Sequence, residues 1–187
     1  MHSRTPFMRR PGGKKPLDEK VAGDPKSAHT AAITFLARRD FSTAELRRKL
    51  KERGYLEPAI ESALASLGSS RVIDDRRYGD NLVAARARRG QGPARIRNEL
   101  RRAGLNAEAV QTTMDQAKED GPDFLKLARA TRARKFGDVI PKDRKERARQ
   151  ARFLQYRGFS TDHIRAVLEG TPDDESELDP GGEPDPN

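Results

Sequence analysis

Apolar residues recur three and four positions apart along most of the chain, which is the spacing of an α-helix with one buried face. Over 26–39, for example, Ala28, Ala32 and Leu36 fall on one such face. No stretch alternates apolar and polar residues with the β-branched side chains that are typical of a strand. Ala, Leu, Arg, Lys and Glu, which are good helix formers, dominate instead. The pattern therefore predicts an all-α fold.

The second predicted helix has recognisable signals at both ends. Ser42 and Glu45 have the spacing of a capping box, in which the serine oxygen accepts from the amide three residues later and the glutamate reaches back. Leu46 and Leu50 follow on one face, four residues apart. Gly54 then supplies the left-handed residue at which many helices end.

The arrangement around Gly54 occurs three times. Each copy has a glycine, a leucine four residues before it and an apolar residue directly after it. The three sets are Leu50, Gly54 and Tyr55; Leu100, Gly104 and Leu105; and Leu154, Gly158 and Phe159. Six and ten residues after each glycine stand further apolar residues: Ile60 and Leu64, Val110 and Met114, and Ile164 and Leu168. This internal repetition predicts three copies of one supersecondary unit.

Each copy is expected to form a three-helix repeat. The repeats span 26–69, 70–120 and 121–169, with helices near 26–39, 42–53 and 57–67, then 74–89, 93–103 and 106–118, then 121–136, 141–157 and 160–169. A unit this small is not very stable alone. We therefore expect the repeats to stack in an elongated, curved arrangement that buries their remaining apolar edges.

The third repeat departs from the pattern in two ways. It contains a four-residue insertion, since the glycines are 50 and then 54 residues apart. It also has Gln150 where the first two repeats have Leu46 and Ile96. The geometry of this repeat is accordingly the least determined by the pattern.

The two ends of the chain differ from the body in composition. Residues 1–25 are rich in Pro, Gly and basic side chains without periodicity, which predicts a disordered basic arm. Residues 170–187 combine prolines with acids and predict a disordered acidic tail. That tail either solubilises the protein or folds back on the body and competes with an anionic partner.

Charge narrows the range of functions. Residues 1–25 hold six Lys/Arg and three Asp/Glu, and residues 169–187 hold eight acids and no base. Given the overall charge of +9, the body over 26–168 carries +14. Such a body attracts polyanions, including nucleic acid, an acidic protein groove or an anionic membrane surface. The plainer alternative is a solvated, Arg-rich face.

Several classes of site are excluded or disfavoured. The chain has no Cys, which excludes disulfides and thiolate metal sites, and it has no run of 18 apolar residues or apolar leader. We therefore expect a cytoplasmic protein that does not span a membrane. His2, His29 and His163 lack metal-ligand spacing, and His163 is interpreted as a surface residue.

Asp74 and Asp75 invite one catalytic interpretation, a nuclease with Asp80 and Glu99 as further metal ligands. Aspartates at the start of a helix more often cap its free amides. We therefore favour capping and predict no catalytic residues, metal or cofactor.

The basic side chains are the candidate binding residues. Most are Arg, which suits bidentate contact with carboxylate or phosphate. Inward-facing leucines and isoleucine place Arg47, Arg48, Arg97, Arg101 and Arg102 mostly outward. The full candidate set is Arg38, Arg39, Arg47, Arg48, Arg88, Arg89, Arg95, Arg97, Arg101 and Arg102.

Four runs of residues occur in the order of a known family. They are Phe41–Leu46 with Leu50 and Gly54, Ile73–Tyr78, Gly92–Ile96 with Glu99, Leu100 and Gly104, and Tyr156–Ser160 with Ile164. Together they resemble the RecX regulatory proteins over about 28–169. The motif positions matched as structural residues are Ser42, Glu45, Leu46, Leu50, Gly54, Asp74, Asp75, Tyr78, Leu100, Gly104, Gly158 and Phe159.

This resemblance implies a regulator rather than an enzyme. RecX-like proteins bind the RecA–DNA filament, lie in its groove and dampen its ATPase, strand-exchange and co-protease activities, which places them in recombination, repair and the SOS response. We expect a monomer whose partner is the RecA filament, with DNA contacted directly or through the filament. The alternatives are a stand-alone helical DNA-binding protein and, as the weakest, the nuclease.

Overall fold

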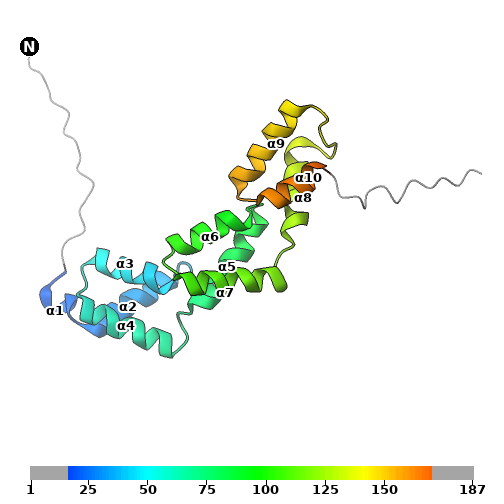
Figure 1. The fold of residues 1–187 in the computed structure, drawn as a ribbon. Helices are drawn as coiled ribbons and strands as arrows, with labels where there is room; N and C mark the ends of the chain where they lie inside the picture. The colour runs from blue at the N-terminus through cyan, green and yellow to red at the C-terminus, as the bar shows by residue number, and fades with distance from the viewer. Residues whose placement is uncertain (1–16, 170–187) are drawn as a thin grey trace, which may run out of the picture. The chain divides into compact units, whose positions relative to one another are not determined.

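The computed structural model describes residues 17–169, and all regular structure in that range is helical (Figure 1). The predicted acidic tail over 170–187 lies outside the described residues, as does the arm up to residue 16. The helices are α1 (Glu19–Ala22), α2 (Pro25–Leu36), α3 (Thr43–Arg53), α4 (Glu57–Ser69), α5 (Asp75–Arg88), α6 (Pro93–Arg102), α7 (Ala107–Glu119), α8 (Phe124–Phe136), α9 (Arg144–Arg157) and α10 (Thr161–Glu169). The three predicted repeats are therefore α2–α4, α5–α7 and α8–α10.

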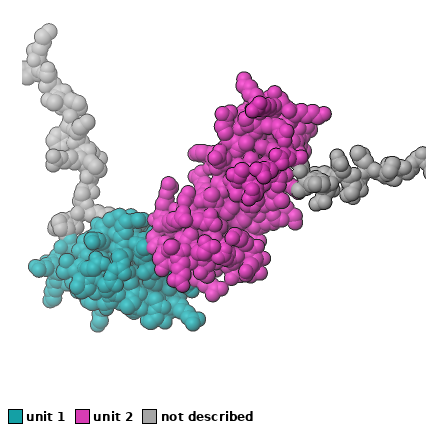
Figure 2. Space-filling view, in the orientation of Figure 1, with its two compact units in different colours: residues 1–75 teal, residues 76–187 magenta. Residues whose placement is uncertain are grey.

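The chain divides into two compact units between Asp75 and Arg76 (Figure 2). The first unit holds α1–α4, and α2, α3 and α4 pack around its core. Leu46, Leu50 and Ile60 are fully buried there because they occupy the predicted inward positions of α3 and α4.

The second unit contains repeats 2 and 3, which share core residues. Tyr78, Ile96 and Leu100 lie in the core of repeat 2, and Phe124 from α8 packs into that same core. Leu127 lies against the cores of both repeats. The two repeats therefore stack, as predicted from their small size, and the first turns of α8 form the contact.

The three predicted glycine stops are confirmed in full. Gly54, Gly104 and Gly158 have φ angles of +105°, +88° and +89°. After each glycine, the next amide donates to the carbonyl of the leucine four residues before that glycine, Leu50, Leu100 or Leu154, at 3.2, 3.2 and 3.1 Å. This is the Schellman closure, and each of the three leucines is completely buried beneath it.

The predicted Ser42 cap is confirmed, whereas Asp75 accepts from an amide of α3 and not of α5, the helix that it was expected to cap. The Ser42 hydroxyl accepts from the Glu45 amide at 3.1 Å, as the capping box requires. The carboxylate of Asp75 accepts from the amide of Thr43 at 2.7 Å. Asp75, at the start of α5, therefore caps the first turn of α3.

The predicted boundary of the basic arm is wrong. The arm was expected to extend to residue 25, but α1 forms within it and α2 begins at Pro25. Ala22 is buried, and its carbonyl accepts from the amide of Leu56 at 2.9 Å. Pro25, interpreted as part of the disordered arm, instead fits the first turn of α2, which Asp24 caps.

Candidate functional site

The positive charge of the body is concentrated in repeat 3. Repeats 1 and 2 each carry a net charge of +3, from eight bases and five acids over 26–69 and from eleven bases and eight acids over 70–120. Residues 121–168 hold thirteen bases and five acids, which gives +8. The candidate arginines proposed from the sequence all lie in the two less basic repeats.

In repeat 1, three of the four candidate arginines already face carboxylates. Arg39 contacts Glu45 at 2.9 Å and stacks over the ring of Phe41, while Arg48 lies 4.0 Å from Glu52. Arg47 on α3 pairs with both Glu57 and Glu61 on α4. Their charge is therefore partly neutralised before any partner binds.

Arg38 differs from these three, because it is exposed and makes no ion pair within the described residues. The structure brings the candidates of repeat 1 to α3 and to the end of α2. All four remain predicted contacts.

In repeat 2, the candidates lie along α6 and at the end of α5. Arg95 is 3.6 Å from Glu99, which also pairs with Arg86. Arg101 donates to the side chain of Asn98 at 3.3 Å. The exposed members are Arg88, Arg89, Arg101 and Arg102, with Arg97 half-buried.

Arg97 also has an acidic neighbour. The pKa of Asp115 lies below its ordinary value, chiefly because the Gln111 amide donates to it and secondarily because Lys118 does. Arg97 contributes a smaller attraction to the same carboxylate. Like those of repeat 1, the predicted contacts of repeat 2 stay predictions.

Repeats 2 and 3 are joined backbone to backbone. The amide of Gly92 donates to the carbonyl of Arg157 at 2.8 Å, and the amide of Ala94 donates to the carbonyl of Gly158 at 3.0 Å. The end of α9 thus caps the start of α6, with opposite ends of the two helix dipoles in contact. A Cβ on Gly92 would lie 2.4 Å from the Gly158 backbone, so the approach requires glycine.

The same junction carries cations and an exposed ring. The Arg157 guanidinium donates to the carbonyl of Arg89 at 3.0 Å. Arg95 lies 5.7 Å from the ring centre of Tyr156, whose surface is 77% exposed. Two candidate arginines, Arg89 and Arg95, are thereby placed beside the basic third repeat within the second unit.

A cluster of rings and cations covers part of α8 and α9. Phe136 and Phe153 meet edge to face, with centroids 5.3 Å apart. Lys135 lies 4.7 Å from the Phe153 centroid, Arg157 lies 5.2 Å from it, and Arg149 lies 5.1 Å from that of Phe136. Cations held over ring faces in this way are stabilised and kept near the surface.

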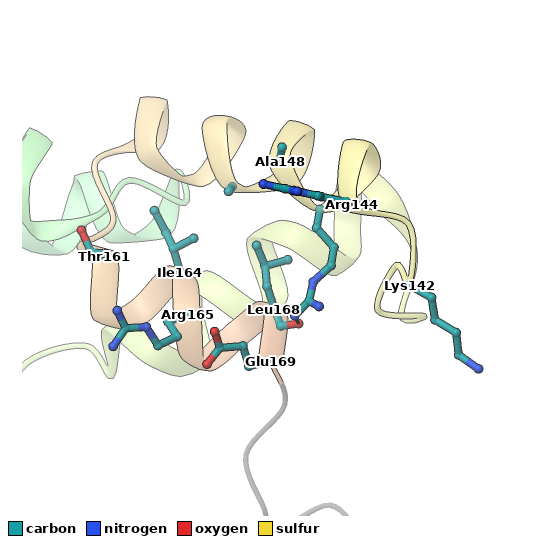
Figure 3. Close-up of a pocket in the computed structure, with 10 residues that line it drawn as sticks. Lys142, Arg144, Ala148, Thr161, Ile164, Arg165, Leu168 and Glu169 are labelled. Carbon is teal, nitrogen blue, oxygen red and sulfur yellow. Dashed lines mark hydrogen bonds between the residues drawn. The ribbon is translucent and has the colours of Figure 1, made fainter.

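A groove lies between α9 and α10 (Figure 3). Its volume is about 600 Å³, its apolar side chains are Ala148, Ala151, Ile164 and Leu168, and its cations are Lys142, Arg144, Arg147 and Arg165. Figure 3 shows Ile164 and Leu168 reaching from α10 towards α9. An apolar floor rimmed by cations suits an extended acidic segment better than a neutral one.

The insertion and the polar substitution of repeat 3 form one structural feature. Arg132, only 4% exposed, donates to the carbonyls of Asp138 and Val139 at 2.6 and 3.1 Å. It also donates to the side-chain oxygen of Gln150 at 3.1 Å. Gln150 is buried at the position of Leu46 and Ile96 because it helps to hold the arginine that anchors the inserted loop.

The acidic residues considered for a nuclease do not assemble. Among residues 17–169 there is no group of three His, Asp or Glu side chains placed to hold a metal ion. Asp75 is engaged with α3, and Glu99 pairs with two arginines.

The prediction that His163 is a surface residue is wrong. Its ring lies against those of Phe159 and Phe124, with centroids 6.3 and 6.4 Å away, and one ring nitrogen is 2.8 Å from the hydroxyl of Ser160. His163 is a half-buried packing residue because α10 turns it towards α8.

Sequence reasoning missed the basic third repeat. The signal was present, since counting charge repeat by repeat singles out 121–168. Only the irregular pattern of this repeat, and not its charge, entered the interpretation of the sequence. Where its side chains lie, and which of them have acidic neighbours, required the structure.

Three family models match the three repeats in order. Residues 28–67 match the model described as "RecX, first three-helix domain", 74–114 the second and 123–168 the third. No helix among the described residues is both long and apolar enough to cross a bilayer.

Several relatives match most of the chain. A "Regulatory protein RecX" from Ectopseudomonas mendocina is 42% identical over 148 residues, which cover 79% of this chain and 96% of that protein. One of the same description from Halorhodospira halophila is 38% identical over 150 residues, covering 80% and 91%.

Solved structures share the fold. The crystal structure of RecX from Lactobacillus salivarius superposes with a TM-score of 0.67 at 18% identity, covering 78% of this chain and 95% of that one. A second crystal structure, of "regulatory protein RecX", gives 0.66 at 22% identity, covering 83% and 79%.

Proposed function

This chain belongs to the RecX family of regulatory proteins, and on that premise we propose that it binds the RecA–DNA filament and lowers the filament's ATPase, strand-exchange and co-protease activities. The observation that carries the proposal is the match of all three repeats to the family's three domains in order. The protein is taken to act as a cytoplasmic monomer, without a cofactor and by binding rather than by catalysis.

Inhibition on this account is mechanical. A protein seated across neighbouring RecA subunits opposes the subunit motions that ATP turnover requires, and it blocks access by other DNA or protein. Such a ligand shifts the equilibrium between subunit arrangements of the filament only by the difference in its affinity for them.

The electrostatic part of the contact is assigned mainly to repeat 3. Residues 121–168 carry +8, more than either of the other repeats, and Arg144, Lys145 and Arg152 on α9 are exposed without an ion pair in the described range. The ten arginines of repeats 1 and 2 are proposed as additional contacts, with Arg89 and Arg95 nearest to repeat 3 along the junction.

Charge reversal on α9 tests this assignment. The variant Arg144→Glu/Lys145→Glu/Arg152→Glu removes three cations that face no carboxylate, so its affinity for a RecA filament on single-stranded DNA should fall at least tenfold, which is about 1.4 kcal/mol. The matched control, Arg48→Glu/Lys49→Glu/Lys51→Glu, changes the total charge equally, but each of these cations lies within 4.0 Å of a glutamate.

Fluorescence anisotropy of labelled protein against preformed filament gives both affinities. The proposal predicts a clearly smaller loss for the repeat 1 control. Equal losses would contradict the assignment to repeat 3, and no saturable binding by the unmodified protein would contradict filament binding itself.

A stand-alone DNA-binding role is the second candidate, and the ring–cation cluster around Phe136 and Phe153 specifically favours it. Binding to DNA without RecA would then be tight and fall steeply with salt, by a slope of about 0.9 per phosphate contact. Weak binding to DNA alone together with tight binding to the filament supports the filament-modulator role.

A further inference from the structure

The groove between α9 and α10 lies at the C-terminal end of the described residues. Glu169 is the last residue of α10 and also lines the groove, and residues 170–187 follow it (Figure 3). The carbonyl of Leu168 accepts from the Arg147 guanidinium of α9 at 2.8 Å. The end of α10 is thereby fixed against α9, at one end of the groove.

The segment that follows is chemically complementary to this groove. Residues 170–187 contain seven acids and no base, whereas the groove presents Lys142, Arg144, Arg147 and Arg165. Leu178 is the one large apolar residue in that segment, and it stands between Glu177 and Asp179. This order of apolar and acidic side chains matches an apolar floor rimmed by cations.

The segment is also long enough. An extended chain spans about 3.3 Å per residue, so the nine residues from Glu169 to Leu178 reach about 30 Å. The nine-residue helix α10 is about 14 Å long. The segment can therefore turn back and lie along the whole groove.

We propose that residues Asp173–Asp179 fold back onto the α9–α10 groove, with Leu178 on its apolar floor and the flanking acids on its cations. The segment then competes in cis with any anionic partner of repeat 3. A short tether gives an effective concentration of about 1 mM, so an intrinsic Kd of about 0.1 mM would weaken a competitor roughly tenfold.

A single spin label tests the docking in the full chain. The protein has no Cys, so Ser176→Cys provides a unique attachment point within the acidic segment. Amide NMR signals of 144–151 and 161–169 should lose intensity to the label, while those of α3 serve as the internal reference. The loss should vanish in 1 M NaCl, where charges are screened within about 3 Å.

Two matched variants test whether charge attraction between the segment and the groove causes this intensity loss. In the first, Asp173→Asn, Asp174→Asn, Glu175→Gln, Glu177→Gln and Asp179→Asn neutralise the segment; in the second, Arg144→Glu and Arg165→Glu reverse the rim. Both should abolish the intensity loss. The proposal would be overturned if the groove signals kept their full intensity with the unmodified segment. It would also be overturned if the intensity loss persisted after the segment was neutralised. A loss of equal size from labelled protein onto separate, isotope-enriched protein would assign the contact to a second copy and overturn docking in cis.

The prediction that the docked segment competes with the RecA filament rests on the proposed function. The neutralised variant should bind the RecA filament about tenfold more tightly than the unmodified chain. Unchanged affinity despite docking would refute the competition. Absence of filament binding by every variant would refute the proposed function instead, while the spin-label result would still decide the docking.

Discussion

Gly92 and Gly158 allow the backbones of repeats 2 and 3 to come into contact, which larger residues would prevent. The sequence predicts Gly158 as a helix stop, and its φ of +89° bears that out. Its second role, in contact with Gly92, does not follow from periodicity, because the two glycines lie 66 residues apart in the sequence. Close backbone approach between distant segments leaves no local pattern.

Gly92→Ala should loosen the junction between repeats 2 and 3. The new methyl would lie 2.4 Å from backbone atoms of Gly158, and overpacking of this kind costs about 1–3 kcal/mol. Gly68→Ala is the matched control: nothing lies within 4 Å, and alanine in a helix should stabilise by about 0.5–1 kcal/mol. Urea unfolding measures both, and a Gly92→Ala protein as stable as the parent would refute the junction as described.

Arg132 and Gln150 are the second residue-scale feature. The glutamine is a departure from the repeat pattern in the sequence, and only the structure links it to the inserted loop. Arg132→Met should destabilise repeat 3 by about 3 kcal/mol, because the buried Gln150 oxygen and two loop carbonyls lose a charged donor.

Adding Gln150→Leu to Arg132→Met should recover part of that stability, since it removes the buried amide that Arg132→Met leaves without its charged donor. A double-mutant cycle from denaturant unfolding gives the coupling. Strictly additive costs would show that the two side chains act independently.

At the scale of the element, helix ends were predicted best. The three Schellman closures and the Ser42 cap follow from Gly and Ser at fixed spacing, because local backbone chemistry determines them. The short helix α1 was missed, since four residues are too few to show a 3.6-residue stripe. Its place depends on a tertiary hydrogen bond between Leu56 and Ala22.

Asp123 gives a pH test at one helix end. Its carboxylate accepts from the amides of Leu125 and Lys126 at the start of α8, and the Lys126 amide is the main reason that its pKa lies below the ordinary 3.8. Asp123→Ala should cost about 1 kcal/mol at pH 7. Asp123→Asn keeps a capping oxygen and should cost less.

The lowered pKa of Asp123 fixes the sign of the pH effect. Its charged form stabilises the fold above pH 3.8, and the benefit is lost as the pH falls below 3.8 through the lower folded pKa. The stability difference between parent and Asp123→Asn should therefore shrink in that acidic window. A difference that stays constant down to pH 2 would contradict the assignment.

At the scale of the molecule, the sequence predicted three repeats and a basic body, and its candidate contact arginines stay predictions. The candidate arginines all lie in repeats 1 and 2, and three of those in repeat 1 face glutamates. Residues 121–168 of repeat 3 carry +8 and a cation-rimmed groove, yet the pattern of this repeat is the least regular. Hydrophobic register and surface charge are separate signals, and only the first determines the fold.

The central claim is that this RecX-family protein restrains a RecA filament by occupying it. The most direct measurement is a titration of ATP hydrolysis by RecA assembled on single-stranded DNA, with the repeat 3 triple variant run in parallel. We predict that the unmodified chain lowers the ATPase rate in a saturable way at amounts stoichiometric with RecA or below, and that the variant requires at least tenfold more protein. An ATPase rate that stays unchanged at stoichiometric amounts of the unmodified chain would contradict the account.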